Sequence, residues 1–231
     1  MPGSNRTRAT FAAYATVNVT RVAVLVAVVT AEEVETFERC IAVGGVALYP
    51  ADTVYALGTE PDSREGVERL YRLKGRRPDK PAAVMFFRLE LALAALAELP
   101  APTAAAAQRL LPGGVTLLLP NPAHRFPLAC GPTPDVLGLR VPRLEGKLAL
   151  MQRVDWPVLQ SSANVSGGAE ARRLADVDES VRAGVDVVLA GGELPGTPST
   201  VVDLTRYHEN GGHRIVREGA VPAAALEAAL G

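Results

Sequence analysis

The chain has 231 residues, of which 48% are hydrophobic and 21% are charged. This composition supplies a hydrophobic core and excludes an intrinsically disordered chain. The 24 Lys and Arg residues balance the 25 Asp and Glu residues, and the resulting net charge of −1 excludes a protein that binds nucleic acid through an overall positive charge. Any site for a polyanion must therefore be local.

The number of cysteines and the length of the longest apolar run indicate where in the cell the protein is expected. Cys40 and Cys130 are too few for a disulfide framework, so we expect a reducing, cytoplasmic location. The apolar run over residues 22–29 is shorter than the about 20 residues that a membrane-spanning helix needs. We expect it to form a buried strand after a flexible tail over residues 1–21. Residues 22–231 are then expected to form one domain without membrane contact.

Caps, glycine and proline breaks, and apolar spacing divide the rest of the chain into helices and strands. The clearest signal is Thr30 followed by Glu33, a capping-box pattern that begins a helix. In chain order, we expect a helix over residues 31–43, a strand over 46–49, a helix over 64–73, a strand over 82–87, helices over 89–99 and 103–111, strands over 115–119 and 138–141, a helix over 147–154, a strand over 157–160, a helix over 176–183, strands over 185–189, 199–203 and 213–217, and a helix over 222–230.

This order of elements predicts an α/β (α+β) fold. Several of the strands follow one another too closely for a crossover helix between each pair. The sheet should therefore be mixed rather than wholly parallel, and curved, with helices packed on its outside. The turn over residues 50–53 follows a buried strand, which is where α/β folds place ligands.

A basic segment over residues 69–80 is the first candidate for a binding site. Its cations are Arg69, Arg72, Lys74, Arg76, Arg77 and Lys80. We expect Lys74 and Arg76 to lie on an exposed loop around Gly75, where an arginine can grip two phosphate oxygens and a lysine adds a point charge. Taken alone, such a run is also typical of a solvated helix end.

The second candidate is the segment over residues 161–168, which follows a predicted buried strand. It offers the hydroxyls of Ser161, Ser162 and Ser166, the amide of Asn164, and backbone N–H groups freed by glycines. A simple Asx or Ser turn uses the same residues. Together with the basic segment, however, it has the composition of a split site for a polyphosphate.

The common nucleotide, zinc and hydrolase signatures are absent from the sequence: there is no GxxxxGK[ST], GxGxxG, HExxH or GxSxG motif and no pair of CxxC motifs. His124, His208 and His213 have no second ligand nearby in the sequence, so we expect surface histidines and no protein metal site. Catalysis by a histidine base is not indicated.

Seven segments in order resemble the signature of one family, the YrdC-type threonylcarbamoyl-AMP synthases. These segments are Tyr49-Pro50-Ala51-Asp52-Thr53-Val54-Tyr55-Ala56-Leu57-Gly58, Lys74-Gly75-Arg76, Pro112-Gly113-Gly114-Val115-Thr116, Leu139-Arg140-Val141-Pro142, Ser162-Ala163-Asn164-Val165-Ser166-Gly167, Pro198-Ser199-Thr200-Val201-Val202-Asp203 and Arg217-Glu218-Gly219-Ala220. The resemblance covers nearly the whole chain. It is to the short form of the family, which lacks an extra C-terminal domain.

The resemblance implies a YrdC/RibB-like twisted mixed parallel and antiparallel sheet around a large open cavity. It implies a nucleotidyltransferase that converts L-threonine, bicarbonate and ATP into threonylcarbamoyl-AMP and pyrophosphate, for the threonylcarbamoyladenosine modification of tRNA. Mg²⁺ would be carried with ATP. Beyond the small-molecule substrates, the implied partners are tRNA and downstream tRNA-modification proteins, not DNA.

The resemblance also implies roles for particular residues. The residues implied to be catalytic are Lys74, Arg76, Ser162 and Asn164. Those implied to bind ATP are Arg76, Lys80, Asn164 and Arg217, and those implied to hold threonine or its carbamate are Thr53, Arg140, Ser162 and Ser199. The chain departs from the usual pattern at Ala51, Ala56 and Met85, where family members carry Thr, Gly and, in some cases, His.

Two alternatives remain open at this point. One is another enzyme of the same fold that handles a carbamoyl-adenylate. The other is a non-catalytic RNA-binding module that uses the basic segment. Single-strand binders also need aromatic platforms, and aromatic residues make up only 5% of the chain, with Tyr71 alone inside that segment.

Overall fold

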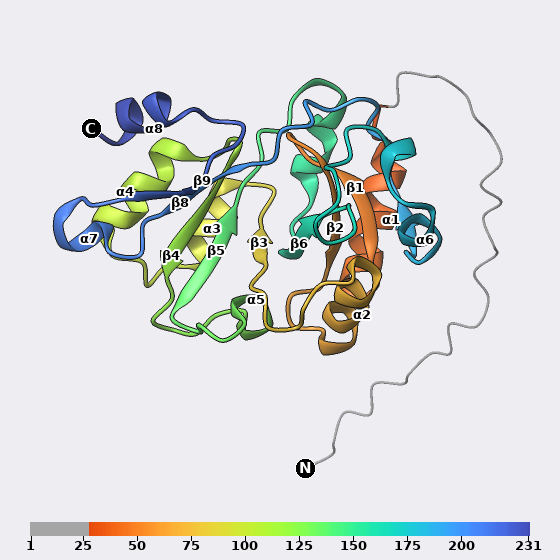
Figure 1. Cartoon of the computed structure of the whole chain (residues 1–231), viewed down its shortest axis with the longest axis horizontal. Helices are drawn as coiled ribbons and strands as arrows, with labels where there is room; N and C mark the ends of the chain where they lie inside the picture. Colours follow the sequence, from red (N-terminus) through yellow and green to blue (C-terminus); the bar gives the residue numbers. More distant parts are fainter. Residues whose placement is uncertain (1–27) are drawn as a thin grey trace, which may run out of the picture.

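The computed structural model describes residues 28–231 (Figure 1). Its helices are α1 (Ala31–Ala42), α2 (Arg64–Lys74), α3 (Leu89–Ala95), α4 (Ala101–Leu110), α5 (Pro127–Cys130), α6 (Glu179–Ala183), α7 (Tyr207–Asn210) and α8 (Ala223–Leu230), with the 3₁₀ helices η1 (Gly146–Arg153) and η2 (Leu174–Asp176). Its strands are β1 (Ala47–Pro50), β2 (Tyr55–Thr59), β3 (Ala83–Met85), β4 (Val115–Pro120), β5 (Val136–Arg140), β6 (Val158–Ser162), β7 (Val187–Val188), β8 (Thr200–Asp203) and β9 (Arg214–Arg217). None of these helices is long and apolar enough to span a membrane.

Within residues 28–231 the strands form a single mixed sheet of nine strands. Their order is β7-β1-β2-β6-β3-β5-β4-β8-β9. The pairs β1–β7, β3–β5 and β4–β8 are parallel, and the other neighbours are antiparallel. The expectation of a mixed sheet is therefore confirmed.

Helices cover the two ends of this sheet (Figure 1). At one end α1, α2 and α6 lie beside β1 and β2, and at the other end α4, α7 and α8 lie beside β4, β8 and β9. The first of these helices begins as predicted, because Thr30 and Glu33 form both hydrogen bonds of a capping box. Helix α5 lies beside the central strands β3 and β5.

Several predicted elements differ in the structure. Strand β2 was not predicted, because all five of its residues are buried and the sequence shows no alternation of apolar and polar residues. The short helices α5 and α7 were also missed. The helix predicted over residues 147–154 forms as the 3₁₀ helix η1, and the strand predicted over residues 185–189 shrinks to the two residues of β7.

The predicted tail over residues 1–21, and residues 22–27 of the predicted first strand, lie outside the described residues. Val28 and Val29, the last two residues of that predicted strand, belong to neither a helix nor a strand. The division of the chain into a tail and a domain beginning at residue 22 therefore stays a prediction.

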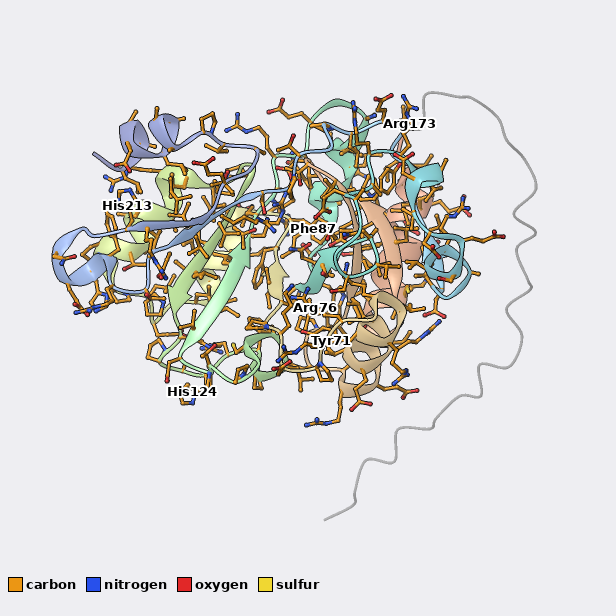
Figure 2. The ribbon with its side chains drawn as sticks, viewed as in Figure 1. Tyr71, Arg76, Phe87, His124, Arg173 and His213 are labelled. Atoms are coloured by element: carbon orange, nitrogen blue, oxygen red, sulfur yellow. The ribbon has the colours of Figure 1, made fainter. Side chains whose placement is uncertain are left out.

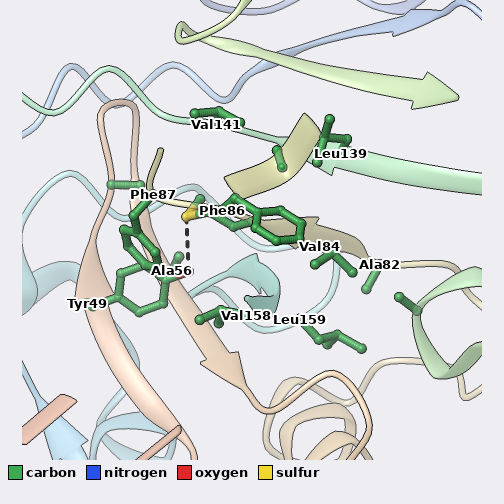
Figure 3. Close-up of a cluster of buried hydrophobic side chains, with 14 of the residues drawn as sticks. Tyr49, Ala56, Ala82, Val84, Phe86, Phe87, Leu139, Val141, Val158 and Leu159 are labelled. Carbon is green, nitrogen blue, oxygen red and sulfur yellow. Dashed lines mark hydrogen bonds between the residues drawn. The ribbon is translucent and has the colours of Figure 1, made fainter. Parts of the chain in front are cut away.

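An aromatic cluster joins α1 to the sheet. The ring centroids of Phe37 and Tyr49 are 5.0 Å apart, and Phe87 lies 5.8 Å from Phe37. Figure 3 shows Tyr49 and Phe87 side by side in this core, where the Tyr49 hydroxyl donates to the sulfur of Met85 at 3.5 Å. Burial raises the pKa of Tyr49 well above its ordinary value. The cluster fixes β1, and with it the turn that follows β1.

The central strands have one face in the core and the opposite face on a cavity. Along β5, Val136, Gly138 and Arg140 line a cavity, whereas Leu137 and Leu139 between them are fully buried. Strand β4 shows the same alternation. Successive side chains of a strand point to opposite faces, so the sheet has a core face and a cavity face.

Candidate functional site

The cavity has a volume of about 670 Å³ and lies on the face of the central strands opposite the core. Its wall combines side chains from β2, β3, β4, β5, β6 and β8 with residues from the loops that follow α2 and β6. The nine residues to which the family resemblance assigns a role all line this cavity: Thr53, Lys74, Arg76, Lys80, Arg140, Ser162, Asn164, Ser199 and Arg217. The other cations of the basic segment, Arg69, Arg72 and Arg77, do not line it and instead pair with Asp186, Glu68 and Asp79. Positions more than 160 residues apart in sequence therefore meet in one place.

Lys74 is the most enclosed cation of the cavity. It is the last residue of α2, and its exposed fraction is 2%. Its ammonium donates to the backbone oxygens of Ser162 and Asn164, the latter at 2.6 Å, and to the Asn164 side-chain oxygen at 3.4 Å. The expectation that Lys74 lies on an exposed loop is wrong, because the turn after β6 covers it.

The lysine and the turn are also joined through their backbones. The Lys74 carbonyl accepts a hydrogen bond from Ser166 N at 2.8 Å. Within the turn, the Ser162 hydroxyl donates to the Asn164 side-chain oxygen at 2.5 Å, and the Asn164 amide donates to the Gly168 carbonyl at 2.6 Å. Ser162 and Asn164 are therefore held in one arrangement around the lysine.

The charge of Lys74 is poorly solvated. Burial, and then the neighbouring Arg76 guanidinium, lower the pKa of Lys74 to about 8, although the Glu170 carboxylate opposes this change. An anion placed in the cavity would favour the protonated form of the lysine. The site therefore favours the binding of a negatively charged ligand.

Arg76 and Lys80 continue the basic wall beyond α2. Gly75 ends the helix in the left-handed conformation, with φ at 57°, and this turns Arg76 back toward the sheet. The Arg76 guanidinium lies 5.5 Å from the centre of the Tyr71 ring and donates to the Pro81 carbonyl. Figure 2 shows Arg76 beside Tyr71, with His124 and His213 far from both.

Arg140 and Thr53 form the opposite part of the wall. The guanidinium of Arg140 is bonded to Asp52 and donates to the Thr53 hydroxyl at 2.7 Å. The side chains of Arg140 and Asp52 are only 3% and 9% exposed, and Asp52 also accepts from Arg143 N at 3.0 Å. Sequence reasoning placed Asp52 in the turn but missed its part in orienting Arg140.

Ser199 and Arg217 close the cavity on the side of β8 and β9. The Ser199 hydroxyl forms a 2.7 Å hydrogen bond with that of Thr116, a residue that sequence reasoning did not single out. Arg217 donates to the Ser199 carbonyl at 2.6 Å. The cavity therefore has lysine and arginine at one side and a second set of hydroxyl and guanidinium groups at the other.

Comparison with known proteins identifies the family. The family model Sua5_yciO_yrdC, described as "Telomere recombination", matches residues 39–219. The chain belongs to this family. The resemblance inferred from the sequence motifs is thereby confirmed.

Relatives in the Sua5/YciO/YrdC family carry an enzyme's name. A threonylcarbamoyl-AMP synthase from Pyrococcus abyssi is 29% identical over 189 residues, which cover 81% of this chain and 54% of the relative. A second protein of that name, from Halorhodospira halophila, is 33% identical over 149 residues, which cover 64% of this chain and 77% of the relative. The chain thus spans about half the length of the Pyrococcus protein.

A solved structure has the same fold. The crystal structure of P. abyssi Sua5 complexed with L-threonine superposes with a TM-score of 0.76 and 27% identity, over 88% of this chain and 58% of that one. The twisted mixed sheet described above is therefore the YrdC-like fold.

Proposed function

We propose that this chain is a threonylcarbamoyl-AMP synthase, a nucleotidyltransferase that forms threonylcarbamoyl-AMP and pyrophosphate from L-threonine, bicarbonate and ATP. The observation that carries the proposal is the Lys74 ammonium clamped by Ser162 and Asn164 on the wall of a cavity that Arg76 also lines. The relatives' name and the threonine complex of P. abyssi Sua5 support the same activity.

The cavity suits a reaction that depends on enclosure and positive charge. The threonine amine attacks the carbon of bicarbonate, a C–N bond forms, and water leaves. A carbamate oxygen then attacks the α-phosphorus of ATP, and the bond to pyrophosphate breaks. The carbamate is short-lived in water, so holding it against the phosphate matters more than a strong base.

The roles that the family resemblance implies divide the residues of the cavity between the two substrates. We assign the nucleotide to Arg76, Lys80, Asn164 and Arg217, whose charges and amide oppose the negative charge that builds up on departing pyrophosphate. Lys74 already donates to three protein oxygens, so it acts by fixing Ser162 and Asn164 and by its charge.

A second set of cavity residues suits the amino acid. We assign threonine and its carbamate to Thr53, Arg140, Ser162 and Ser199, among which Arg140 supplies a buried guanidinium for a carboxylate. Mg²⁺ binds phosphate oxygens and water readily and needs few protein ligands. A cavity wall with one acidic residue among the described residues fits an ion that arrives on ATP.

The setting of the reaction follows from its substrates and product. We propose that the enzyme works in the cytoplasm, where ATP is available, and that its adenylate is passed to proteins that modify tRNA.

Pyrophosphate release tests the proposal. The full chain is incubated with MgATP and bicarbonate, with and without L-threonine, and the Lys74→Met variant serves as the matched control. Release that requires threonine and is lost in the variant supports the synthase. Pyrophosphate release that does not depend on threonine would instead indicate an enzyme that handles a carbamoyl-adenylate. Tight, salt-sensitive RNA binding without nucleotide turnover would indicate an RNA-binding module.

A further inference from the structure

Glu170 is the only acidic residue among the described residues that line the cavity. It lies in the loop between β6 and η2, and both ends of this loop are fixed to the same residue. Ala163 N donates to the Tyr55 carbonyl at 2.8 Å, and Tyr55 N donates to the Ala171 carbonyl at 3.0 Å. Glu170 directly precedes Ala171 and is therefore held near Tyr55, the first residue of β2. Tyr55 follows Thr53 by two residues.

The Glu170 carboxylate has no partner within the described part of the chain. Its Oε2 atom is buried and accepts no hydrogen bond from residues 28–231. Lys74 is close enough to feel its charge, but the three ammonium hydrogens of Lys74 already point at three other oxygens. A buried acceptor without a donor is unfavourable, so a donor supplied by a ligand would be stabilising here.

The same cavity contains an unpaired donor. The Nε atom of Arg76 is buried and, like Oε2 of Glu170, has no partner among the described residues. The site thus contains one carboxylate oxygen and one guanidinium N–H that residues 28–231 leave without a partner. A ligand set that satisfies both must supply a hydrogen-bond donor and a hydrogen-bond acceptor, and a cationic donor suits the carboxylate best.

We propose that Glu170 binds the α-amino group of the amino-acid substrate. The inference rests on the proposed function, in which threonine is the substrate with a basic amine that carries positive charge, whereas the amino group of adenine is neutral and the phosphates of ATP and bicarbonate are anions that Glu170 repels. The carboxylate accepts a hydrogen bond from the threonine nitrogen. That nitrogen keeps one N–H after bicarbonate addition, so the contact survives in the carbamate. Glu170 therefore orients the nitrogen and keeps the phosphates on the side of Arg76.

Equilibrium binding and kinetics of the full chain test this assignment. Glu170→Gln and Glu170→Ala are compared with the wild type and with Glu65→Gln, which removes the same charge from an exposed position on α2. We expect the dissociation constant and KM for L-threonine to rise about tenfold or more in Glu170→Ala, as for a lost hydrogen bond to a charged group. We expect less than about a twofold change in ATP affinity, and no change in Glu65→Gln.

A ligand lacking the amine sharpens the test. 3-Hydroxybutanoate, in which hydrogen replaces the amine of threonine, should bind the wild type and Glu170→Ala about equally, because it offers Glu170 no donor at that carbon. Unchanged threonine binding in both Glu170 variants would overturn the inference. A fall in ATP affinity as large as the fall in threonine affinity would also overturn it, since Glu170 would then serve as a counterion of Lys74. An increase in the Mg²⁺ concentration that the Glu170 variants need for activity would overturn it as well.

The outcome is separable from that of the proposed function. Wild-type protein that binds threonine through Glu170 but releases no threonine-dependent pyrophosphate would refute the synthase and leave the inference standing. Normal turnover that both Glu170 variants retain, with an unchanged KM for threonine, would refute the inference alone.

Discussion

Replacing Lys74 by Met should reduce stability by an amount that grows with pH. The variant keeps most of the side-chain volume but removes the donor to the backbone oxygens of Ser162 and Asn164. Two buried acceptors without a donor cost about 1–3 kcal/mol each. Against this, a lysine pKa lowered from 10.5 to about 8 means that holding the charge in the folded protein costs about 3 kcal/mol at neutral pH. From the midpoint of these costs we expect a net loss of about 1 kcal/mol at pH 7.

The pH dependence follows from proton linkage. Between pH 8 and 10.5 the unfolded chain binds more protons at Lys74 than the folded chain does, so the wild type gains stability as the pH rises. The variant lacks this gain. The difference in unfolding free energy between wild type and variant should therefore widen by about 2 kcal/mol from pH 7 to pH 9.5.

Urea unfolding followed by circular dichroism at both pH values measures this difference. Lys80→Met is the matched control, because Lys80 lines the same cavity but is exposed, so its replacement should change the unfolding free energy by less than about 0.5 kcal/mol. A Lys74 difference that stays constant or narrows as the pH rises would refute the reasoning that burial holds this lysine at a lowered pKa.

Three further predictions concern the rest of the cavity. Arg76→Ala should lower the rate of pyrophosphate release at least about a hundredfold. It should change the unfolding free energy by less than about 1 kcal/mol, since the guanidinium is partly exposed and mainly contacts the Pro81 carbonyl and the face of the Tyr71 ring. Comparable losses of stability and activity would contradict this. Asp52→Ala should lower the unfolding free energy by about 3–5 kcal/mol, because it leaves the buried Arg140 charge without its partner, and thermal unfolding with a near-normal midpoint would speak against that ion pair. ATP affinity, measured by titration calorimetry, should weaken as the pH rises through about 8 and Lys74 loses its charge, and in Lys74→Arg the affinity should stay flat over the same range.

Local signals in the sequence predicted the parts of the fold that local interactions determine. The capping box at Thr30 and Glu33 set the start of α1, and Gly75 set the end of α2. Strand β2 had no such signal, because it is buried on both faces and is recognisable only from its pairing with β1 and β6. Its position depends on contacts that are distant in sequence.

The candidate site also combines features that local sequence signals predict with features that depend on contacts distant in sequence. The sequence motifs supplied Lys74 and Asn164, but the exposure of Lys74 was predicted wrongly, since the cover comes from a turn about 90 residues further along the chain. Asp52 and Glu170 gave no signal of their own. Each acquires a role only when the fold places it beside Arg140 or on the cavity wall.

Mass spectrometry of the reaction product tests the central claim most directly. The purified chain is incubated with L-threonine, bicarbonate labelled with ¹³C, and MgATP, and the mixture is searched for threonylcarbamoyl-AMP. The arrangement of Lys74, Arg76, Ser162 and Asn164 around one cavity predicts an adenylate that carries the label and disappears when threonine or ATP is omitted. Protein that is folded and binds ATP, yet forms no labelled adenylate under these conditions, would contradict the account.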